Sequence, residues 1–325
     1  MTIEPTPPAD GGYAASRAEV DGAARFESDV VFTVRPDGPL AGDLVLPAGR
    51  GPWPVMVLVH GGGFQAGDKA METGWARYLA SIGVASFAVN YRLSTPERPT
   101  FPEALFDVKA AVRFLRTHAG EFGLDSEAIG VMGESAGGHL AAMTVLTSDM
   151  PEFTEDNTDP AMERVRIAVP VVGVFDLLAR WEHDQLHRPL DHVSEKFLGG
   201  TPMSSRETFY KASPLTHSST AQAAGTRWLV IWGDHDDVVD HTTQALPFVV
   251  ALKRAGALVR TRALVGADHF WSMPTSVPPS TGGYMTQATD AVGAFLDNWS
   301  GWHLPEPTPV NQALAHTETH SPAPA

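Results

Sequence analysis

One serine stands between glycines at the spacing that a catalytic serine nucleophile requires. Residues 133–138 read Gly-Glu-Ser-Ala-Gly-Gly, after the apolar run AIGVM and before a stretch of small residues. This order is typical of a strand, a sharp turn and a helix. Side chains two residues before or after Ser135 would collide with backbone, which explains both glycines. Ser135 is therefore predicted to be a nucleophile, and the alternative is an exposed serine in a glycine-rich turn.

The backbone around Ser135 also suits a developing negative charge. The N–H of Ala136 would lie at the start of the helix, where it has no intrahelical partner and where the helix dipole favours an anion. We therefore predict that Ala136 donates to an oxyanion. Glu134 is expected to face away from the substrate in a turn of this kind, so its predicted role is structural.

A second glycine cluster, His60-Gly61-Gly62-Gly63-Phe64, follows the apolar run 55–59. Three glycines let backbone approach a ligand closely and direct N–H groups toward it. These N–H groups are expected to meet that of Ala136 at the carbonyl oxygen of a substrate. A phosphate loop is excluded because neither of the usual phosphate-binding spacings is present. His60 is predicted to fix the loop and not to act as a base.

A serine hydroxyl is a weak nucleophile and requires a base. In this class of strand–turn–helix site the chain order is serine, acid, histidine. His269 follows the apolar run that ends at residue 266, beyond the carboxyl end of an expected strand, where open α/β sheets place their sites. We predict His269 to be the base, because other histidines lie on other segments or in the tail.

The acid is expected in the cluster Asp234-His235-Asp236-Asp237, which follows the strand-like run 227–233. Asp236 is predicted to be the acid because it lies three residues beyond the strand, where the chain should turn above the sheet. Asp237 and Asp234 remain alternatives, and Asp237 and Asp240 are expected to cap the next helix. Asp268 adjoins His269 and is not expected to reach its ring nitrogen.

Strand and helix signals alternate along the chain, which predicts a mostly parallel sheet of about eight strands with helices on both faces. The first two strands are expected to form an antiparallel pair. The expected strands are 29–34, 43–47, 55–60, 84–91, 128–133, 166–176, 227–233 and 259–266. The expected helices are 72–82, 101–118, 136–147, 242–255 and 283–298.

The composition divides the chain into three parts. Residues 1–25 are rich in Pro, Gly and Ala and are predicted to be a flexible arm or lid. Residues 26–300 are predicted to be one catalytic domain, in which 177–222 forms a small cap-like insertion over the site. Residues 301–325 carry no apolar periodicity and are predicted to be a disordered tail.

The motifs HGGGF, GESAGG, GDHDD and GADHF, together with Asn90-Tyr91-Arg92, resemble the α/β-hydrolase superfamily over about residues 40–300. They resemble its esterase branch with an HGGG oxyanion loop, which includes hormone-sensitive-lipase-like, feruloyl- and acetylxylan-esterase-like and kynurenine-formamidase-like enzymes. The resemblance implies the α/β-hydrolase fold and makes Gly62 and Gly63 oxyanion donors beside Ala136. The short N-terminus and the GDHDD acid cluster depart from the lipase pattern, which leaves the substrate class open.

These residues predict a serine carboxylic-ester hydrolase that acts through an acyl-enzyme on a small to medium ester, without a metal or cofactor. An amidase or formamidase, a biosynthetic acyl-transfer or cyclising enzyme, and a non-catalytic binding protein remain alternatives. Five aromatic residues on loops near the expected site are predicted to line its pocket, with ordinary packing as the alternative. They are Phe64, Phe175, Trp181, Phe270 and Trp271.

Charge and composition exclude several classes of partner. The formal net charge is −15, which argues against binding nucleic acid or an anionic membrane. The chain has no cysteine, so disulfides and thiolate sites are absent. The N-terminus does not resemble a signal peptide and no apolar run could span a bilayer, so a cytoplasmic enzyme is expected. A homodimer is left open.

Overall fold

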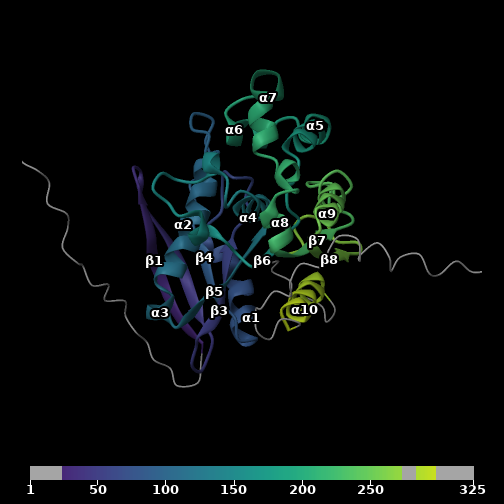
Figure 1. Cartoon of the computed structure of the whole chain (residues 1–325). Helices are drawn as coiled ribbons and strands as arrows, with labels where there is room; N and C mark the ends of the chain where they lie inside the picture. The colour runs from purple at the N-terminus through teal and green to yellow at the C-terminus, as the bar shows by residue number, and fades with distance from the viewer. Residues whose placement is uncertain (1–23, 273–282, 298–325) are drawn as a thin grey trace, which may run out of the picture.

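The computed structural model describes residues 24–272 and 283–297. The predicted arm, apart from residues 24 and 25, and the predicted tail lie outside this range. Within it, one eight-stranded sheet has the order β1-β2-β4-β3-β5-β6-β7-β8 (Figure 1). The strands are β1 Arg25–Arg35, β2 Gly38–Leu46, β3 Trp53–Val59, β4 Ala85–Val89, β5 Leu124–Glu134, β6 Ile167–Val171, β7 Arg227–Gly233 and β8 Leu258–Leu264.

The first two strands are antiparallel, and the other strands run parallel to one another. β1 pairs antiparallel with β2, and β2 pairs antiparallel with β4, whereas β4, β3, β5, β6, β7 and β8 form parallel neighbours. The central strands are buried on both faces, and every residue from Val55 to Val59 is 0% exposed. This burial explains why β3 is a continuous apolar run without alternation.

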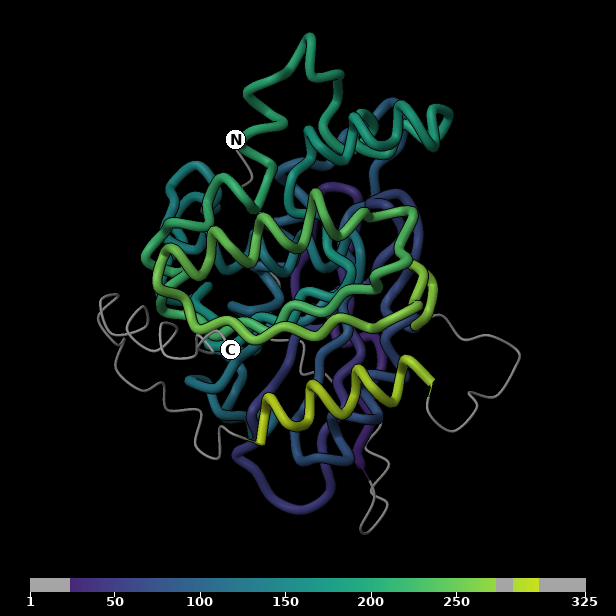
Figure 2. Tube along the Cα trace, turned by 90° about the vertical axis from the view of Figure 1, so that its right-hand side faces the viewer, coloured from purple at the N-terminus to yellow at the C-terminus, as the bar shows by residue number. Residues whose placement is uncertain are grey.

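Helices cover both faces of the sheet, and each face has its own apolar core. α1 and α10 pack on one face around Trp75, Leu79 and Phe295, whereas α2, α4 and α9 pack on the other. Figure 2 shows α9 and α10 on opposite sides of β8. The helices of these layers are α1 Thr73–Ser81, α2 Glu103–Thr117, α3 Ala119–Phe122, α4 Ala136–Leu146, α9 Ala245–Arg254 and α10 Tyr284–Asp297, with 3-10 turns η1 Lys69–Glu72, η2 Pro151–Phe153 and η3 Pro160–Glu163.

The segment between β6 and β7 is mainly helical. It holds α5 Leu177–His187, α6 Val193–Leu198, α7 Pro202–Lys211, η4 Pro214–His217 and α8 Ala221–Gly225. α5, α6 and α7 gather at one end of the sheet (Figure 1). We call α5, α6 and α7 the cap helices. Among the described residues, no helix is both long enough and apolar enough to cross a membrane.

Register places the loops that the sequence singles out next to one another. Val59, at the end of β3, pairs with Gly133 near the end of β5, so the glycine loop 60–64 starts beside the serine turn. Gly233, at the end of β7, pairs with Leu264, at the end of β8, so the acid and histidine loops also start together. Because these strands are parallel, all four loops leave the same edge of the sheet.

Candidate active site

Ser135 lies at the tip of a strained turn between β5 and α4. Its φ and ψ are 54° and −115°, an arrangement that few non-glycine residues adopt. A Cβ at Gly133 would lie 2.4 Å from the carbonyl oxygen of Gly137, and a Cβ at Gly137 would lie 1.9 Å from that of Val59. Both glycines are therefore required by close backbone contact, for the steric reason that the sequence suggested.

The side chains of Ser135, His269 and Asp236 form one hydrogen-bonded row. His269 Nε2 lies 3.0 Å from Ser135 Oγ, and His269 Nδ1 lies 2.7 Å from Asp236 Oδ2. His269 and Asp236 are 7% and 6% exposed, so their interaction is little screened by water. With its proton on Nδ1, the ring of His269 donates a hydrogen bond to Asp236, which leaves Nε2 free to accept the proton of the serine.

Asp236 is held in place by its own loop. Its Oδ1 accepts hydrogen bonds from the backbone N–H groups of Val238, at 3.0 Å, and Val239, at 2.7 Å. One carboxylate oxygen is thus fixed by backbone, and the other faces His269. The geometry therefore selects Asp236 among the acids of the cluster.

The competing acids make other contacts. Asp234 Oδ1 accepts the N–H of Gly266, and Asp268 Oδ1 accepts the N–H of Phe270 in its own turn. Asp240 Oδ1 accepts the N–H of Thr242 in a turn before α9, whose N-cap residue is Gln244, so the predicted cap by Asp240 does not occur. The predicted cap by Asp237 does not occur either: in the described chain, Asp237 contacts His183 through its backbone carbonyl oxygen, which lies 3.0 Å from His183 Nε2.

Two glycines of the loop have positive φ, and a side chain at Gly62 would collide with backbone. Gly62 has φ +113° and Gly63 has φ +59°, and a Cβ at Gly62 would lie 2.0 Å from the carbonyl oxygen of Ala66. The carbonyl of Gly62 accepts the N–H groups of residues 65 and 66. In the described chain, no backbone acceptor is recorded for the N–H groups of Gly62, Gly63 and Ala136. These donors are therefore available to a ligand next to Ser135.

A cavity of about 190 Å³ lies over Ser135 and His269. Two of the aromatic residues predicted to line it do so, Phe64 and Phe270. Phe64 is 1% exposed, whereas Phe270 is 50% exposed. Phe270 therefore offers the cavity an accessible ring, and Phe64 forms part of its floor.

The other three aromatic residues do not line this cavity, so their predicted place was wrong. Phe175 is fully buried and stacks on Phe248, with ring centroids 4.1 Å apart. Trp181 lies on the cap helix α5, not on a loop, and donates its Nε1–H to Glu195 of α6 at 2.8 Å. Trp271 packs on the core cluster beneath the sheet. Position on a loop near the site did not reveal which way each ring turns.

Several aliphatic residues that line the cavity were not singled out from the sequence. They are Val172, Val174, Leu177, Val193 and Val238. Val172 and Val174 follow the carboxyl end of β6, so the rule that placed the acid and the histidine at strand ends would also have found them. Leu177 and Val193 belong to the cap helices, and no local signal in the sequence relates them to Ser135.

A model of the BD-FAE family matches residues 43–249. The chain belongs to this family. The match covers β2 to α9, and therefore includes Ser135 and Asp236 but ends before His269.

Curated relatives of this BD-FAE chain carry names of ester hydrolases. It is 32% identical over 203 residues to the probable carboxylic ester hydrolase LipM of Mycobacterium tuberculosis. The aligned region covers 62% of this chain and 45% of LipM. It is 30% identical over 224 residues to esterase LipC of the same organism, and this alignment covers 67% of this chain and 53% of LipC. The chain thus spans about half the length of these relatives.

Solved structures of similar fold include two esterases. The apo form of Thermogutta terrifontis esterase 2 has a TM-score of 0.67 and 25% identity, over 89% of this chain and 98% of that chain. A truncated carbohydrate esterase from gut microbiota has a TM-score of 0.69 and 21% identity, over 88% of this chain and 99% of that chain. These likenesses confirm the predicted α/β-hydrolase fold.

His60, the first residue of the glycine loop, packs against Tyr91 and fixes the start of the loop. His60 is 1% exposed, and its ring stacks on the ring of Tyr91, with centroids 4.4 Å apart. Tyr91 Oη donates to the carbonyl oxygen of His60 at 3.0 Å, and His60 Nδ1 lies 2.7 Å from that of Gly61. Burial lowers the pKa of His60, so the ring is neutral at neutral pH. These contacts agree with the predicted structural role of His60.

Phe64 joins the glycine loop to two other parts of the chain. Its carbonyl oxygen accepts the N–H of Ser94 at 2.7 Å. Its ring stacks on Phe197 of α6, with centroids 3.8 Å apart. The loop is therefore held between a cap helix and the segment that follows β4.

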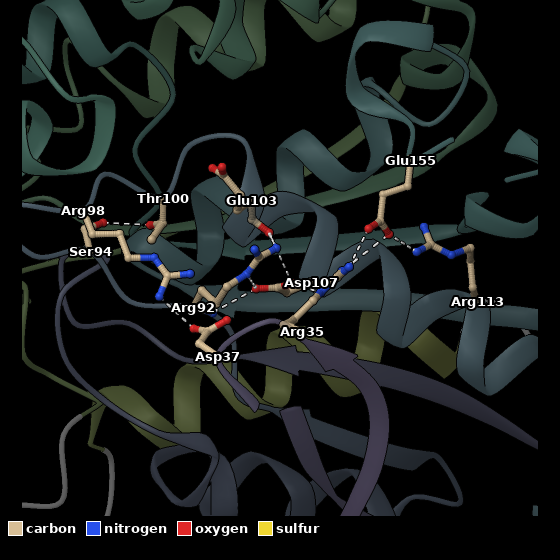
Figure 3. A network of polar contacts seen from close by, with 10 residues as sticks. All are labelled: Arg35, Asp37, Arg92, Ser94, Arg98, Thr100, Glu103, Asp107, Arg113 and Glu155. Carbon is tan, nitrogen blue, oxygen red and sulfur yellow. Dashed lines mark hydrogen bonds and ion pairs between the residues drawn. The ribbon is translucent and has the colours of Figure 1, made fainter. Parts of the chain in front are cut away.

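A network of ion pairs fixes the segment that follows β4 (Figure 3). The carboxylate of Asp107 on α2 is 0% exposed and accepts from Arg92 Nε and Arg35 Nε, both at 2.8 Å. Arg35 and Arg113 both pair with Glu155 (Figure 3). A buried carboxylate is stable only when it is paired, and two arginines satisfy Asp107. Arg92 and Asp107 thus anchor the Asn90-Tyr91-Arg92 motif, whose tyrosine contacts the glycine loop.

Glu134 ties the histidine loop to α1. It accepts the Nε1–H of Trp75 at 2.8 Å and the hydroxyl of Ser272 at 3.0 Å. Burial raises the pKa of Glu134, although these two donors lower it in part. Burial, and then the charge of Glu134, raise the pKa of Glu72 well above its ordinary range. Glu134 also lines the cavity, so it faces the site more closely than expected while making structural bonds.

His139 on α4 joins the core of the site to the end of the cap. It is 0% exposed, and its Nε2 lies 2.7 Å from the carbonyl oxygen of Ala212, directly after α7. Burial lowers the pKa of His139 from 6.5 to about 4. Between about pH 4 and pH 6.5, the ring is therefore neutral in the folded protein and protonated in the unfolded chain.

The depressed pKa of His139 predicts an acid-sensitive stability. The unfolded state binds the proton below about pH 6.5 and the folded state only below about pH 4, so stability falls as pH falls through this window. The loss from this group alone reaches about 3 kcal/mol. Urea unfolding from pH 7 to pH 4.5 should show a shallower pH dependence for His139→Gln, which carries no titrating ring. Parallel curves for variant and wild type would contradict this assignment.

Within residues 24–272 and 283–297, no group of three or more His, Cys, Asp or Glu side chains is arranged to hold a metal ion.

Proposed function

We propose that this protein is a serine carboxylic-ester hydrolase in which Ser135 is the nucleophile, His269 the base and Asp236 the residue that orients the base. The observation that carries the proposal is the row of distances from Ser135 Oγ to His269 Nε2, 3.0 Å, and from His269 Nδ1 to Asp236 Oδ2, 2.7 Å. Both lie within hydrogen-bond range, which a nucleophile and its base require. The esterase names of the relatives agree with this reaction.

In the first half of the proposed reaction, Ser135 Oγ attacks the ester carbonyl while His269 Nε2 takes its proton. The oxyanion that forms is bound by the N–H groups of Gly62, Gly63 and Ala136. Losing one such donor typically costs about 3–4 kcal/mol of barrier lowering. The imidazolium, stabilised by Asp236, then gives its proton to the departing alcohol and leaves an acyl-enzyme.

In the second half, water replaces the alcohol. His269 takes a proton from water as the oxygen attacks the acyl carbonyl, and the same backbone donors bind the second oxyanion. The proton then passes from His269 to Ser135 Oγ, which releases the carboxylic acid and restores the enzyme. Every step uses side chains and backbone of this chain, since one hydroxyl, one imidazole and one carboxylate suffice for acyl transfer to water.

The size of the cavity predicts short acyl chains. Its volume of about 190 Å³ is below the range of about 300–1,000 Å³ that is usual for drug-sized ligands. We expect p-nitrophenyl acetate and butyrate to be turned over with a kcat/KM roughly tenfold or more above that of the octanoate. Initial rates of p-nitrophenol release at a series of concentrations measure this. A kcat/KM that increases up to octanoate would contradict the short-chain expectation.

The same assay separates esters from amides. N-formylkynurenine, run beside the esters, presents a formamide to the same residues. Turnover of the esters with little or no turnover of the formamide supports the proposed function. Folded protein that cleaves the formamide and no ester would make it a formamidase, and the ester-hydrolase proposal would be wrong.

A further inference from the structure

A cap helix places a buried arginine on the wall of the cavity that contains Ser135. Arg180 lies on α5, whose first turn is capped by Asp176. It lines the same cavity as Ser135 and His269, and its side chain is 6% exposed. A guanidinium is always charged at neutral pH, so such a position requires partners or a ligand.

Two of the three guanidinium nitrogens of Arg180 are held by the protein. Nε donates to Asp184 Oδ2 at 2.8 Å, and Nη1 donates to the carbonyl oxygen of Val238. Val238 follows Asp236 in the acid loop, so the guanidinium is fixed relative to the proposed catalytic residues. A fixed donor loses little freedom when a ligand binds.

The third nitrogen, Nη2, has no hydrogen-bond partner among the described residues. It is also not among the buried side-chain atoms that the protein encloses without a partner. Because Arg180 lines the cavity, this nitrogen is the part of the guanidinium left for a ligand. A charged donor in a largely apolar cavity gains most from an oxygen acceptor that carries negative charge.

Three further polar residues from residues 188–194 line the same cavity: Arg188, Asp191 and Ser194. Arg188 lines the cavity and donates its Nε to Asp191 at 2.6 Å, with a side chain that is 36% exposed. Ser194 on α6 also lines the cavity, and its buried Oγ has no partner in the described chain. The cap segment thus offers the cavity donors beside the carboxylate of Asp191, which Arg188 holds, whereas the lining residues that follow β6, such as Val172 and Val174, are aliphatic.

We propose that Arg180 binds a carboxylate on the substrate, so that the preferred esters are half-esters of small dicarboxylic acids. This inference rests on the proposed ester hydrolysis. A half-ester has one ester group for Ser135 and one carboxylate for Arg180, and a short dicarboxylic chain suits a cavity of about 190 Å³. Arg180 is then a specificity-determining residue for this reaction.

The acidic net charge of the chain opposes an anionic substrate, but its effect is weak at this site. Exposed charges are screened beyond about 8 Å at physiological ionic strength, whereas a buried guanidinium is screened much less. The pairing of Arg180 with Asp184 does not use up its donors, because Asp184 accepts a hydrogen bond from Nε and none from Nη2. Local hydrogen bonding therefore decides the preference.

The test compares an anionic ester with its neutral isostere. Monoethyl succinate and ethyl succinamate differ only in a carboxylate against a carboxamide, and ethanol release reports the turnover of both. The wild type should favour monoethyl succinate by roughly 10- to 100-fold in kcat/KM, the worth of a hydrogen bond to a charged group. Equal kcat/KM values, or a preference for the neutral ester, would overturn the proposal.

Arg180→Gln should abolish this preference. Because Arg180 also holds Val238, the variant is expected to lose some activity on both esters, and the ratio of their kcat/KM values is the decisive readout. A ratio near one in Arg180→Gln supports the proposal, and a ratio unchanged from wild type overturns it. If Arg180→Gln fails to fold, the double variant Arg180→Gln/Asp184→Asn, which removes both members of the ion pair, takes its place. The proposal predicts a ratio near one for the double variant as well.

Two controls separate this inference from its premises. Arg206→Gln removes an exposed arginine from the cap helix α7, outside the cavity lining, and should keep the wild-type ratio. Turnover of p-nitrophenyl acetate by the wild type shows that the proposed function holds even if the carboxylate preference fails. Succinate should inhibit that turnover at a concentration at which succinamide does not, and equal inhibition by both would count against Arg180 as a carboxylate site.

Discussion

Ser135→Ala is expected to lower kcat for p-nitrophenyl acetate by about 10⁶-fold, as is His269→Ala. The first change removes the attacking oxygen, and the second removes the group 3.0 Å away that takes its proton. The double variant should be no slower than either single variant, because the two residues act as one unit. Initial rates of p-nitrophenol release at saturating substrate measure kcat for each variant.

A matched serine controls for general damage. Ser148 is 1% exposed and follows α4, outside the cavity lining, and Ser148→Ala should keep most of the wild-type kcat. The thermal midpoints of Ser135→Ala and His269→Ala should stay close to that of the wild type, since each change removes polar atoms next to a cavity. Substantial residual turnover in folded Ser135→Ala would remove Ser135 from the mechanism.

Asp236→Asn is expected to lower kcat by about 10⁴-fold. Asp236 Oδ1 accepts two backbone N–H groups, so an asparagine would place its oxygen there and its NH₂ group toward His269 Nδ1. Nδ1 would then have to accept a hydrogen bond, which places the ring proton on Nε2 and blocks the base. Kinetics on p-nitrophenyl acetate over a range of pH measure the loss.

Asp237→Asn is the matched control for the acid. Asp237 directly follows Asp236 in the same acidic cluster, and within the described chain it is Asp236, not Asp237, whose side chain contacts His269. It should keep a kcat close to wild type. A nearly inactive Asp237→Asn together with a nearly normal Asp236→Asn would reverse the assignment of the acid.

The sheet could be predicted from the sequence because its strands are signalled locally. β3, β7 and the second half of β5 are apolar runs of a length that suits a strand buried on both faces, and each is followed by residues with chemical function. The serine turn could also be predicted, since its glycines are required by contacts between neighbours in the sequence. Parallel pairing then brings the ends of these strands together.

The walls of the cavity could not be predicted, because they depend on how distant elements pack. Arg180 reaches the acid loop across 58 residues, and Phe64 stacks on a ring of α6. Phe175 lies close to strand β6 in the sequence, yet it turns into the core because Phe248 offers a flat apolar partner. Side-chain direction in such loops is decided by tertiary contacts and not by spacing.

The ion pair of Arg92 with Asp107 could not be predicted from the sequence either. Arg92 and Asp107 are separated by 15 residues and a turn, and the sequence gives no sign that they meet. A motif of three residues marked the segment, but its role became visible only when the carboxylate of Asp107 was found buried between two arginines. The sequence therefore identified the reacting groups better than the residues that support them.

Covalent labelling tests the central claim most directly. A fluorophosphonate reacts with a serine only when that serine is activated, and it mimics the ester carbonyl at the point of attack. After incubation with the wild type, peptide mass spectrometry should find one modified residue, Ser135, and both Ser135→Ala and His269→Ala should remain unlabelled. Folded wild-type protein that stays unlabelled, or that carries the label on another residue, would contradict the proposed catalytic row.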